Sequence, residues 1–294
     1  MKHIIKNKLF SVINVIPNPV IVTSCDKLQS VNNAFLEFFE IKSIEEFNKV
    51  YGCVSKLFVQ NNDFFTISDT KEGQYWTDYL FSHPEVIRIV SIMDTNNQMI
   101  DFELTLKKIE NKSEYVIVFN DITQFIVEKN EYKYFAYHDH LTKIYNRQKF
   151  DEILLLKLED KKRYKDNLSI LLLDIDHFKV VNDTYGHYIG DLTLIALTKL
   201  ISRNLRINDI FARWGGEEFI ILLPRTGITD AYNKAQEIRM MVESHIEKEL
   251  PKITVSIGVI EINNSDNSNT CLQRVDDALY LAKEKRNDVK VKEI

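Results

Sequence analysis

Residues 210–223 read Ile-Phe-Ala-Arg-Trp-Gly-Gly-Glu-Glu-Phe-Ile-Ile-Leu-Leu, and this stretch decides the fold of the second half of the chain. Apolar, β-prone residues stand on both sides of Gly215-Gly216, which is typical of two antiparallel strands joined by a tight turn. The favoured two-residue hairpin turns need positive φ, which glycine adopts without steric penalty. We therefore predict a two-residue hairpin that presents Glu217 and Glu218 at its tip.

A second acidic cluster, Asp174-Ile175-Asp176, ends a continuous apolar run over residues 167–174. Such a run is typical of a strand that is buried on both faces. Helices are predicted over residues 191–206, 230–248 and 270–285, and a further strand over residues 253–260. The pattern predicts an α/β domain in which helices cover a central sheet.

Asp174 and Glu217 carry the oxygen atoms that a hard divalent cation prefers as ligands. Mg²⁺ takes few carboxylates, keeps several waters and completes its shell with phosphate oxygens of the substrate. Acidic residues also end strands at a protein surface without any such role, and each cluster alone favours that plainer interpretation. The remaining motifs decide between the two.

The region from residue 139 to about residue 289 resembles the GGDEF family of diguanylate cyclases. The resemblance rests on Asp139-His140-Leu141-Thr142, Asn146-Arg147, residues 174–187, Gly190-Asp191, residues 213–219, residues 254–258 and residues 277–283. It implies a nucleotidyl-cyclase-like, palm-like fold and the condensation of two GTP molecules into cyclic di-GMP with release of two pyrophosphates. One domain of this kind holds one GTP, so the resemblance also implies a homodimer with the site at its interface.

The resemblance assigns the metal ligands and the catalytic groups. Asp174, Glu217 and the Ile175 carbonyl are expected to hold Mg²⁺ or Mn²⁺. Glu218 is expected to be a second carboxylate on the metal side and to deprotonate the attacking 3′-hydroxyl. Metal ions activate the nucleophile and offset phosphate charge in such reactions, so positioning supplies most of the catalysis.

The substrate ligands also follow from the resemblance. They are Asn182 and Asp191 for the guanine edge, and the backbone near Phe178 and Lys179 with the side chains of Lys179, Lys283 and Arg286 for the phosphates. The carboxylate at position 191 favours GTP over ATP. For the two lysines the alternative is an exposed helix charge, while Asn146, Arg147, His177, His187 and Trp214 are expected to serve the fold.

Arg206-Ile207-Asn208-Asp209 matches the Arg-x-x-Asp product-inhibition motif of the family in type and in its offset from Gly215. Arg206 and Asp209 are therefore expected to bind cyclic di-GMP, because arginine grips phosphate or guanine with two hydrogen bonds. The alternative is a surface turn with a local ion pair, which contributes little.

The end of the chain departs from the family pattern Lys-x-x-Gly-Arg-Asn. This chain reads Lys283-Glu284-Lys285-Arg286-Asn287. We interpret the glycine as missing, which brings Arg286 one residue nearer to Lys283 and affects its reach toward a phosphate.

The first region alternates β-rich runs with turn signals and is expected to be an α+β domain over residues 1–123. Residues 16–22, 31–35 and 118–123 resemble a PAS sensor domain, with an antiparallel sheet and helices. Residues 102–106 and 115–119 are predicted to be paired antiparallel strands. No flavin-attachment cysteine motif is present, His83 is a poor basis for haem, and the signal of the domain stays open.

Residues 124–138 are expected to form a helical connector to the domain at 139–294. Ile122, Phe125, Lys129, Tyr132 and Ala136 lie near heptad spacing. Two interpretations stay open at this point: a two-helix coiled coil between two chains, or an amphipathic helix packed on its own domain.

The composition sets outer limits. The 294 residues carry a net charge of −5, which argues against a general nucleic-acid binder. No apolar run of 18 residues occurs and the first residues do not read as a signal peptide, so we expect no membrane insertion and a cytoplasmic location. Cys25, Cys53 and Cys271 are expected to be free thiols in a reducing compartment.

Two other functions compete with the cyclase interpretation. One is a catalytically weak regulatory module that binds GTP or cyclic di-GMP, which the altered end of the chain favours. The other is a cyclase that acts on a single nucleotide as a monomer.

Overall fold

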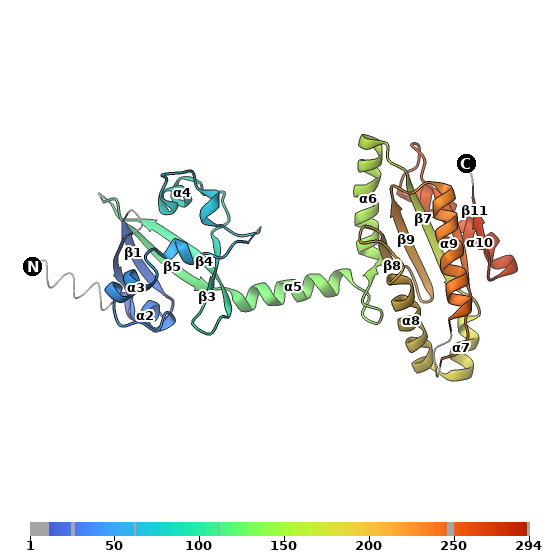
Figure 1. Ribbon diagram of the computed structural model, residues 1–294, viewed down its shortest axis with the longest axis horizontal. Coiled ribbons are helices and arrows are strands. Elements are labelled where there is room, and N and C mark those ends of the chain that lie inside the picture. The colour runs from blue at the N-terminus through green and yellow to red at the C-terminus, as the bar shows by residue number, and fades with distance from the viewer. Residues whose placement is uncertain (1–11, 25–26, 62, 111, 246–249, 293–294) are drawn as a thin grey trace, which may run out of the picture. The chain divides into compact units, whose positions relative to one another are not determined.

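The computed structural model describes residues 12–24, 27–61, 63–110, 112–245 and 250–292, and it contains two compact units, residues 1–131 and 132–294 (Figure 1). Each unit is built on its own sheet. Cys53 and Cys271 are free thiols. Cys25 and the expected end of the helix at 230–248 lie outside the described residues.

The described part of the first unit holds a five-stranded antiparallel sheet in the order β2-β1-β5-β4-β3. Its strands are β1 (Val20–Ser24), β2 (Lys27–Val31), β3 (Ile89–Met93), β4 (Met99–Lys108) and β5 (Tyr115–Asp121). The predicted pairing of the last two strands is confirmed, with Leu104 opposite Phe119. Buried and exposed residues alternate along much of β4, as they do when a sheet packs on one face.

Helical segments and aromatic rings complete the first unit. The segments are α2 (Asn33–Phe38), α3 (Ile44–Val50), α4 (Trp76–Ser82) and the 3₁₀ turns η1 (Val54–Leu57) and η2 (Ile67–Asp69). The fully buried Asn32 caps α2 by accepting from the Phe35 N–H, and its amide donates to three carbonyls of the preceding segment. The rings of Phe35, Phe39 and Phe47 lie about 5 Å apart in the core.

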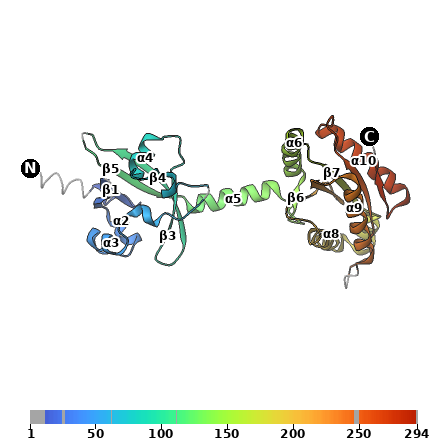
Figure 2. The same cartoon turned by 45° about the horizontal axis from the view of Figure 1, so that its top comes forward.

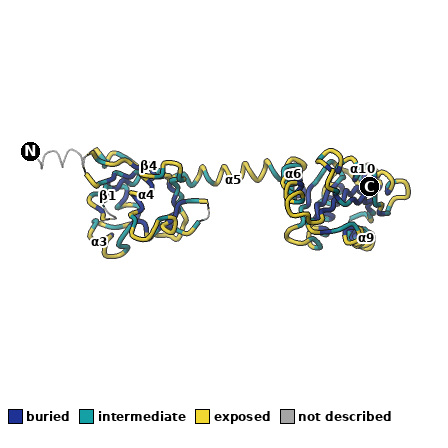
Figure 3. Tube along the Cα trace, turned by 90° about the horizontal axis from the view of Figure 1, so that it is seen from above, coloured by how far each residue is buried: buried dark blue, intermediate teal, exposed yellow. Residues whose placement is uncertain are grey.

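The helix α5 (Thr123–Tyr137) leaves the first sheet after Asp121, whose carboxylate accepts from the Thr123 N–H. An aspartate that accepts from the backbone two residues further on favours such an exit from strand to helix. None of the residues of α5 is buried, and Figure 3 shows the helix largely in the colour of exposed residues. This exposure gives no support to the interpretation of a helix packed on its own domain, and both interpretations of residues 124–138 stay predictions.

The described part of the second unit holds a six-stranded sheet in the order β11-β10-β7-β9-β8-β6. Its strands are β6 (Tyr145–Asn146), β7 (Leu168–Ile175), β8 (Ile210–Arg213), β9 (Glu218–Pro224), β10 (Val255–Glu261) and β11 (Val289–Val291). The two short strands β6 and β11 pair in parallel at the edges, and the central pairs are antiparallel.

Helices cover both faces of this sheet, as predicted. They are α6 (Arg147–Tyr164), α7 (Phe178–Tyr185), α8 (His187–Ser202), α9 (Ile228–Ser244) and α10 (Ser268–Lys285). Leu171 and Leu173 pack with α7, α8 and α9, whereas Ile170 and Leu172 pack with α6 and α10. Figure 2 shows the strands between these two layers. All eight residues of β7 are buried.

Gly258 on β10 marks the closest approach between α10 and the sheet. A Cβ atom at this position would lie 2.3 Å from the Leu279 nitrogen and 2.5 Å from the Val275 oxygen, both of them backbone atoms. Only glycine therefore fits at this contact, and α10 is held directly against β10.

Candidate active site

The β7–β9 ladder brings the two acidic clusters together. Asp174 lies directly opposite Glu218 in the ladder. The backbone N–H of Ile175 donates to the backbone carbonyl oxygen of Glu217 over 3.3 Å. Asp174 is 8% exposed, because β7 is covered on both faces up to its end. The carboxylates of Asp174 and Glu218, from two distant parts of the sequence, thus meet at one end of the central strands, and Glu217 is the neighbouring residue.

The loop between β8 and β9 differs from the predicted two-residue hairpin. It spans Trp214 to Glu217, and neither glycine has a left-handed backbone. Arg213 explains the wider loop, because its guanidinium donates to the carbonyls of Gly215 and Gly216. Gly215 instead leaves room for Glu218, whose Oε2 would lie 3.0 Å from a Cβ there. Glu218 is the first residue of β9 rather than part of the tip.

Arg213 also ties the loop to the beginning of the second unit. Its Nη1 donates to both carboxylate oxygens of Asp139, over 3.0 and 3.2 Å. Burial alone raises the pKa of Asp139, but hydrogen bonds from Thr142 and Arg213 outweigh it and leave the pKa lowered. Asp139 is thus held as a charged anchor for the loop that carries Glu217.

Asn146, Arg147 and Trp214 serve the fold, as expected. Asn146 caps α6 by accepting from the Lys149 N–H, and its amide donates to the Ala136 carbonyl. The Arg147 guanidinium lies 4.1 Å from the centre of the Trp214 ring.

Lys283 faces the acidic cluster from the last turn of α10. Its Nζ donates to Asp174 Oδ2 over 2.7 Å and lies 4.0 Å from Glu218 Oε1. Burial raises the pKa of Asp174 to about 6, with the charges of Glu217 and Glu218 adding to the rise and Lys283 opposing it. The negative charge of Asp174 is therefore unfavourable at this position unless a cation stands beside it, as Lys283 does.

The donor set fits a hard divalent cation that shares its shell with a phosphate. Within the described ranges, no three His, Cys, Asp or Glu side chains converge to form a closed metal site. Mg²⁺ needs only one or two carboxylates when phosphates and waters complete its shell. Asp174 and Glu218 can supply these carboxylates, and Glu217 is the neighbouring residue. The Lys283 ammonium group already lies beside Asp174, which shows that the site accommodates a cation.

The expected guanine ligands lie together where α7 crosses α8. A Cβ atom on Gly190 would lie 1.9 Å from Asn182 Oδ1, so the Asn182 amide packs directly against the residue before Asp191. The Cζ atom of Phe178 would lie 3.4 Å from the same Cβ atom on Gly190. Asn182 is half-buried and Asp191 is exposed, which leaves both polar groups open to a ligand.

The first turn of α7 has no side-chain cap. His177 precedes it with φ of 58°, and its carbonyl accepts from Val180 and Val181. The N–H groups of Phe178 and Lys179 therefore stand at an uncapped helix start, where anions bind well. Lys179 itself is exposed and makes no hydrogen bond or ion pair among the described residues.

The end of α10 corrects the interpretation of the missing glycine. Arg286 has φ of 59° and ψ of 166°, a conformation that is essentially reserved for glycine. Arg286 thus takes the backbone place of the family's glycine, three residues after Lys283, and no residue is deleted. Asn287 then stands where the family has arginine, and its side chain binds Arg239 and Glu243 on α9.

Asp176 is a structural residue to which the sequence analysis gave no role. Its carboxylate accepts hydrogen bonds from Ser256 and Thr254, each over 2.6 Å, and from the Asn287 N–H over 2.9 Å. It therefore joins the end of β7 to β10 and to the segment after Lys283. In the sequence, the hydroxyl residues Thr254 and Ser256, two positions apart on one predicted strand, could have indicated a buried acceptor such as Asp176.

Arg206 and Asp209 lie in an exposed turn after α8, which begins and ends earlier than predicted. Asp209 accepts from the Arg206 backbone N–H over 2.8 Å. The surface turn of the alternative interpretation is therefore present, but within the described residues no ion pair joins the side chains of Arg206 and Asp209. A groove beside the turn is also lined by Lys161, Tyr164 and Arg225.

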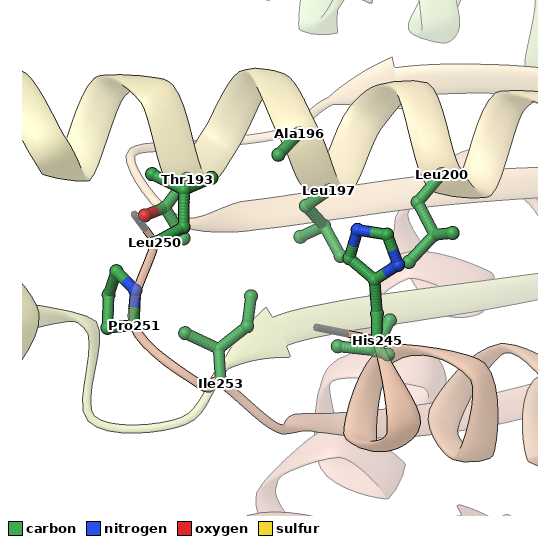
Figure 4. A pocket seen from close by; sticks show the side chains of 9 residues that line it. Thr193, Ala196, Leu197, Leu200, His245, Leu250, Pro251 and Ile253 are labelled. Atoms are coloured by element: carbon green, nitrogen blue, oxygen red, sulfur yellow. The ribbon is translucent and has the colours of Figure 1, made fainter. Parts of the chain in front are cut away.

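A separate small pocket lies between α8 and residues 250–253 (Figure 4). Its cavity volume is about 30 Å³, and leucines, an alanine, a proline and an isoleucine supply most of its lining. It contains none of the predicted site residues and is too small for a nucleotide.

Comparison with known protein families identifies the family to which the second unit belongs. A family model described as "Diguanylate cyclase, GGDEF domain" matches residues 136–288, just over half of the chain. The chain belongs to the GGDEF family of diguanylate cyclases. Among the helices of the described residues, none has the length and apolar character that a membrane crossing requires.

Two curated relatives cover this region. Diguanylate cyclase DgcM of Escherichia coli K12 is 39% identical over 166 residues, which are 56% of this chain and 40% of DgcM. Diguanylate cyclase A of Treponema denticola is 32% identical over 206 residues, which are 65% of this chain and 56% of the relative. The chain thus spans about half of the length of these relatives.

A solved structure shares the fold. The coiled coil and GGDEF domain of DgcB from Caulobacter crescentus, in complex with c-di-GMP, aligns with a TM-score of 0.56 and 30% identity. The alignment covers 58% of this chain and 93% of that one. The α/β architecture of the second unit is therefore that of known GGDEF domains.

Proposed function

We propose that this protein condenses two GTP molecules into cyclic di-GMP and two pyrophosphates. The observation that carries the proposal is the pairing of Asp174 with Glu218 at the end of β7 and β9. This pair places negative charge, buried at Asp174 and partly exposed at Glu218, at the ends of two central strands, as a metal–triphosphate site requires. Membership of the GGDEF family and the names of DgcM and Diguanylate cyclase A support the same reaction.

Each half of the site has its own task. Asn182 and Asp191 bind the guanine edge, and the first N–H groups of α7 with Lys179 bind phosphate. Mg²⁺ or Mn²⁺, when bound by Asp174, Glu217 and the Ile175 carbonyl, offsets phosphate charge and activates the nucleophile. Glu218 accepts the proton of the 3′-hydroxyl.

The in-line geometry calls for two copies of the chain. The 3′-oxygen of one GTP attacks the α-phosphate of the other, so two half-sites face each other across a homodimer. Along α5 the apolar side chains Phe125, Tyr132 and Phe135 are exposed, which supports pairing with α5 of a second copy. We assign residues 124–138 to this connector and 139–294 to the catalytic domain.

The first domain, residues 1–123, is proposed to be a PAS-like sensor that regulates the cyclase through α5. Its five-stranded antiparallel sheet supports this assignment, and its ligand is open. Arg206 and Asp209 are proposed to bind the product as a feedback site. The use of GTP fits a cytoplasmic location.

The test is incubation of the purified full chain with GTP and Mg²⁺, with detection of cyclic di-GMP. Glu218→Gln is expected to lower the rate by about a hundredfold or more, because it removes the general base. Glu103→Gln, an exposed carboxylate on β4, is the matched control and keeps the rate. If neither the wild type nor Arg206→Ala yields product, the proposal is wrong.

The altered end of α10 favours one other candidate, a binding module with weak catalysis. Asn287 occupies the place of the family's arginine and is bound to α9, so Arg286 is the remaining arginine of this segment. Tight GTP binding without product would favour this candidate. Activity that is linear in enzyme concentration for a monomer would favour a cyclase of single nucleotides.

A further inference from the structure

The space between Asp174 and Glu218 already contains a positive group. Lys283 Nζ lies 2.7 Å from Asp174 Oδ2 and 4.0 Å from Glu218 Oε1. The two carboxylates stand opposite each other in the ladder, where like charges destabilise a sheet. The ammonium group relieves this repulsion in the protein without nucleotide.

The other basic groups of the site do not serve this purpose. Arg213 is bound to Asp139 and to the glycine carbonyls of its loop. Lys179 is exposed at the start of α7. Among the described residues, Lys283 is therefore the cation that lies against the acidic pair.

We propose that Lys283 is a resident counter-ion that holds the place of the metal and exchanges Asp174 for a phosphate when metal and triphosphate bind together. A magnesium ion lies about 2.1 Å from each of its oxygen ligands. A dication at that distance from the Asp174 carboxylate repels an ammonium group that is bound to the same carboxylate. Lys283 is 38% exposed, so its four-carbon stem has room to move.

The exchange couples the two ligands. A metal ion that arrives alone displaces Lys283 from its partner and gives it none in return. A metal ion that arrives with a triphosphate supplies a new anionic partner. Binding of the metal and of the nucleotide is therefore mutually reinforcing, and the reinforcement is reciprocal. This inference rests on the proposed metal and phosphate sites.

The probe is Mn²⁺, titrated into the full chain with and without a GTP analogue whose α,β bridge is methylene. Free Mn²⁺ is read by electron paramagnetic resonance. Lys283→Met is expected to tighten binding of Mn²⁺ alone by roughly tenfold, a typical coupling between sites. It is also expected to lose most of the gain that the analogue gives to the wild type.

Three further variants control for charge and folding. Lys283→Gln is expected to repeat the result of the methionine variant, and Lys283→Arg to stay close to wild type because it keeps the charge. Lys285→Met removes an exposed charge from the same helix turn and is expected to leave Mn²⁺ binding unchanged. Thermal unfolding of each variant establishes that it is folded.

The proposal is overturned if both neutral variants, folded, bind Mn²⁺ alone no more tightly than the wild type. It is also overturned if the wild type binds no Mn²⁺ under either condition, or if Lys285→Met tightens binding equally. Product formation by the wild type is measured in parallel. Absence of cyclic di-GMP together with tighter Mn²⁺ binding by the neutral variants would refute the proposed function and uphold the counter-ion.

Discussion

The two units build antiparallel strands into sheets that are covered differently. Along β4 in the first unit, Leu104 and Leu106 are buried while Glu103 and Thr105 are exposed. Along β7 in the second unit, every residue is buried, and two separate cores lie on its two faces. A sheet covered on both faces has only its strand ends left for chemistry, and that is where Asp174 stands.

The largest expected effect is on the free energy of unfolding, and it tests whether both faces of β7 are covered. Leu172→Ala and Leu173→Ala face opposite cores, and each is expected to lower the free energy of unfolding by about 4 kcal/mol. In the first unit, Leu104→Ala is expected to have a similar effect, while Glu103→Ala changes stability by no more than about 0.5 kcal/mol.

Tryptophan fluorescence during denaturant unfolding measures each unit separately. The chain has two tryptophans, Trp76 in the first unit and Trp214 in the second. Replacing one by phenylalanine leaves the other as the reporter. A small effect of either Leu172→Ala or Leu173→Ala would show that one face of β7 is not a core.

The coverage of β7 could be predicted from the sequence, because an unbroken apolar run has no polar face to expose. The structure pairs Asp174 with Glu218 and places Asn182 against Gly190, while the roles of Asp174, Asn182 and Asp191 follow from the family resemblance and stay predictions. The hairpin of β8 and β9 is confirmed, but its two-residue turn was predicted wrongly. Local preference for such a turn ignores the distant Asp139, which holds Arg213 against the loop. Interactions between residues 74 positions apart leave no local signal.

The absence of a local signal for distant contacts also explains why the role of Asp176 and the backbone conformation of Arg286 were not predicted. The partners of Asp176 lie 78 to 111 residues away in the chain, so no spacing rule pairs them. The backbone of Arg286 is set by the contacts that hold the following residue, and arginine itself disfavours this conformation. In both cases tertiary contacts override what the local sequence prefers.

Substitutions of one glycine in each unit are expected to affect stability by an intermediate amount. Gly73 in the first unit has φ of 78° and open space around it, whereas Gly190 faces the Asn182 amide. Gly73→Asn is expected to be tolerated, because asparagine adopts positive φ. Gly190→Ala is expected to lower the free energy of unfolding by about 2 kcal/mol through overpacking.

A double-mutant cycle checks the cause. In an Asn182→Ala background, most of the loss caused by Gly190→Ala should disappear, because the clashing oxygen is gone. Gly190→Ala alone should also raise KM for GTP severalfold. Equal losses in both backgrounds would contradict the close contact between α7 and α8.

Burial of charge gives the next effect, a dependence on pH. The pKa of Asp174 is raised from 3.8 to about 6, so the folded protein binds this proton more tightly than the unfolded chain. Its contribution to stability is present below about pH 4 and is lost as the pH rises through about 6. Asp174→Asn is expected to gain about 1.4 kcal/mol relative to wild type between pH 5 and pH 8.

Chemical denaturation of both proteins at several pH values measures this gain. The difference between the two proteins is the quantity of interest, because other titrating groups cancel in it. A difference that stays constant from pH 5 to pH 8, or that falls, would mean that the Asp174 carboxyl is not desolvated.

The smallest expected effect concerns backbone strain. In the first unit a left-handed position is filled by Asn97, a tolerant residue, whereas in the second Arg286 fills a glycine position. Arg286→Gly is expected to raise the free energy of unfolding by about 1 kcal/mol. Asn287→Gly should lower it, because the bonds to Arg239 and Glu243 are lost. Thermal melting of both variants distinguishes the signs.

The contact at Gly258 has a consequence for timing. Because α10 lies against β10 backbone to backbone, the helix has no room to slide, and Lys283 changes partner by rotating its own side chain. Rotamer changes of exposed side chains take picoseconds to nanoseconds, whereas collective helix movements take microseconds to milliseconds. The proposed exchange of Lys283 between carboxylate and phosphate is therefore too fast to limit turnover.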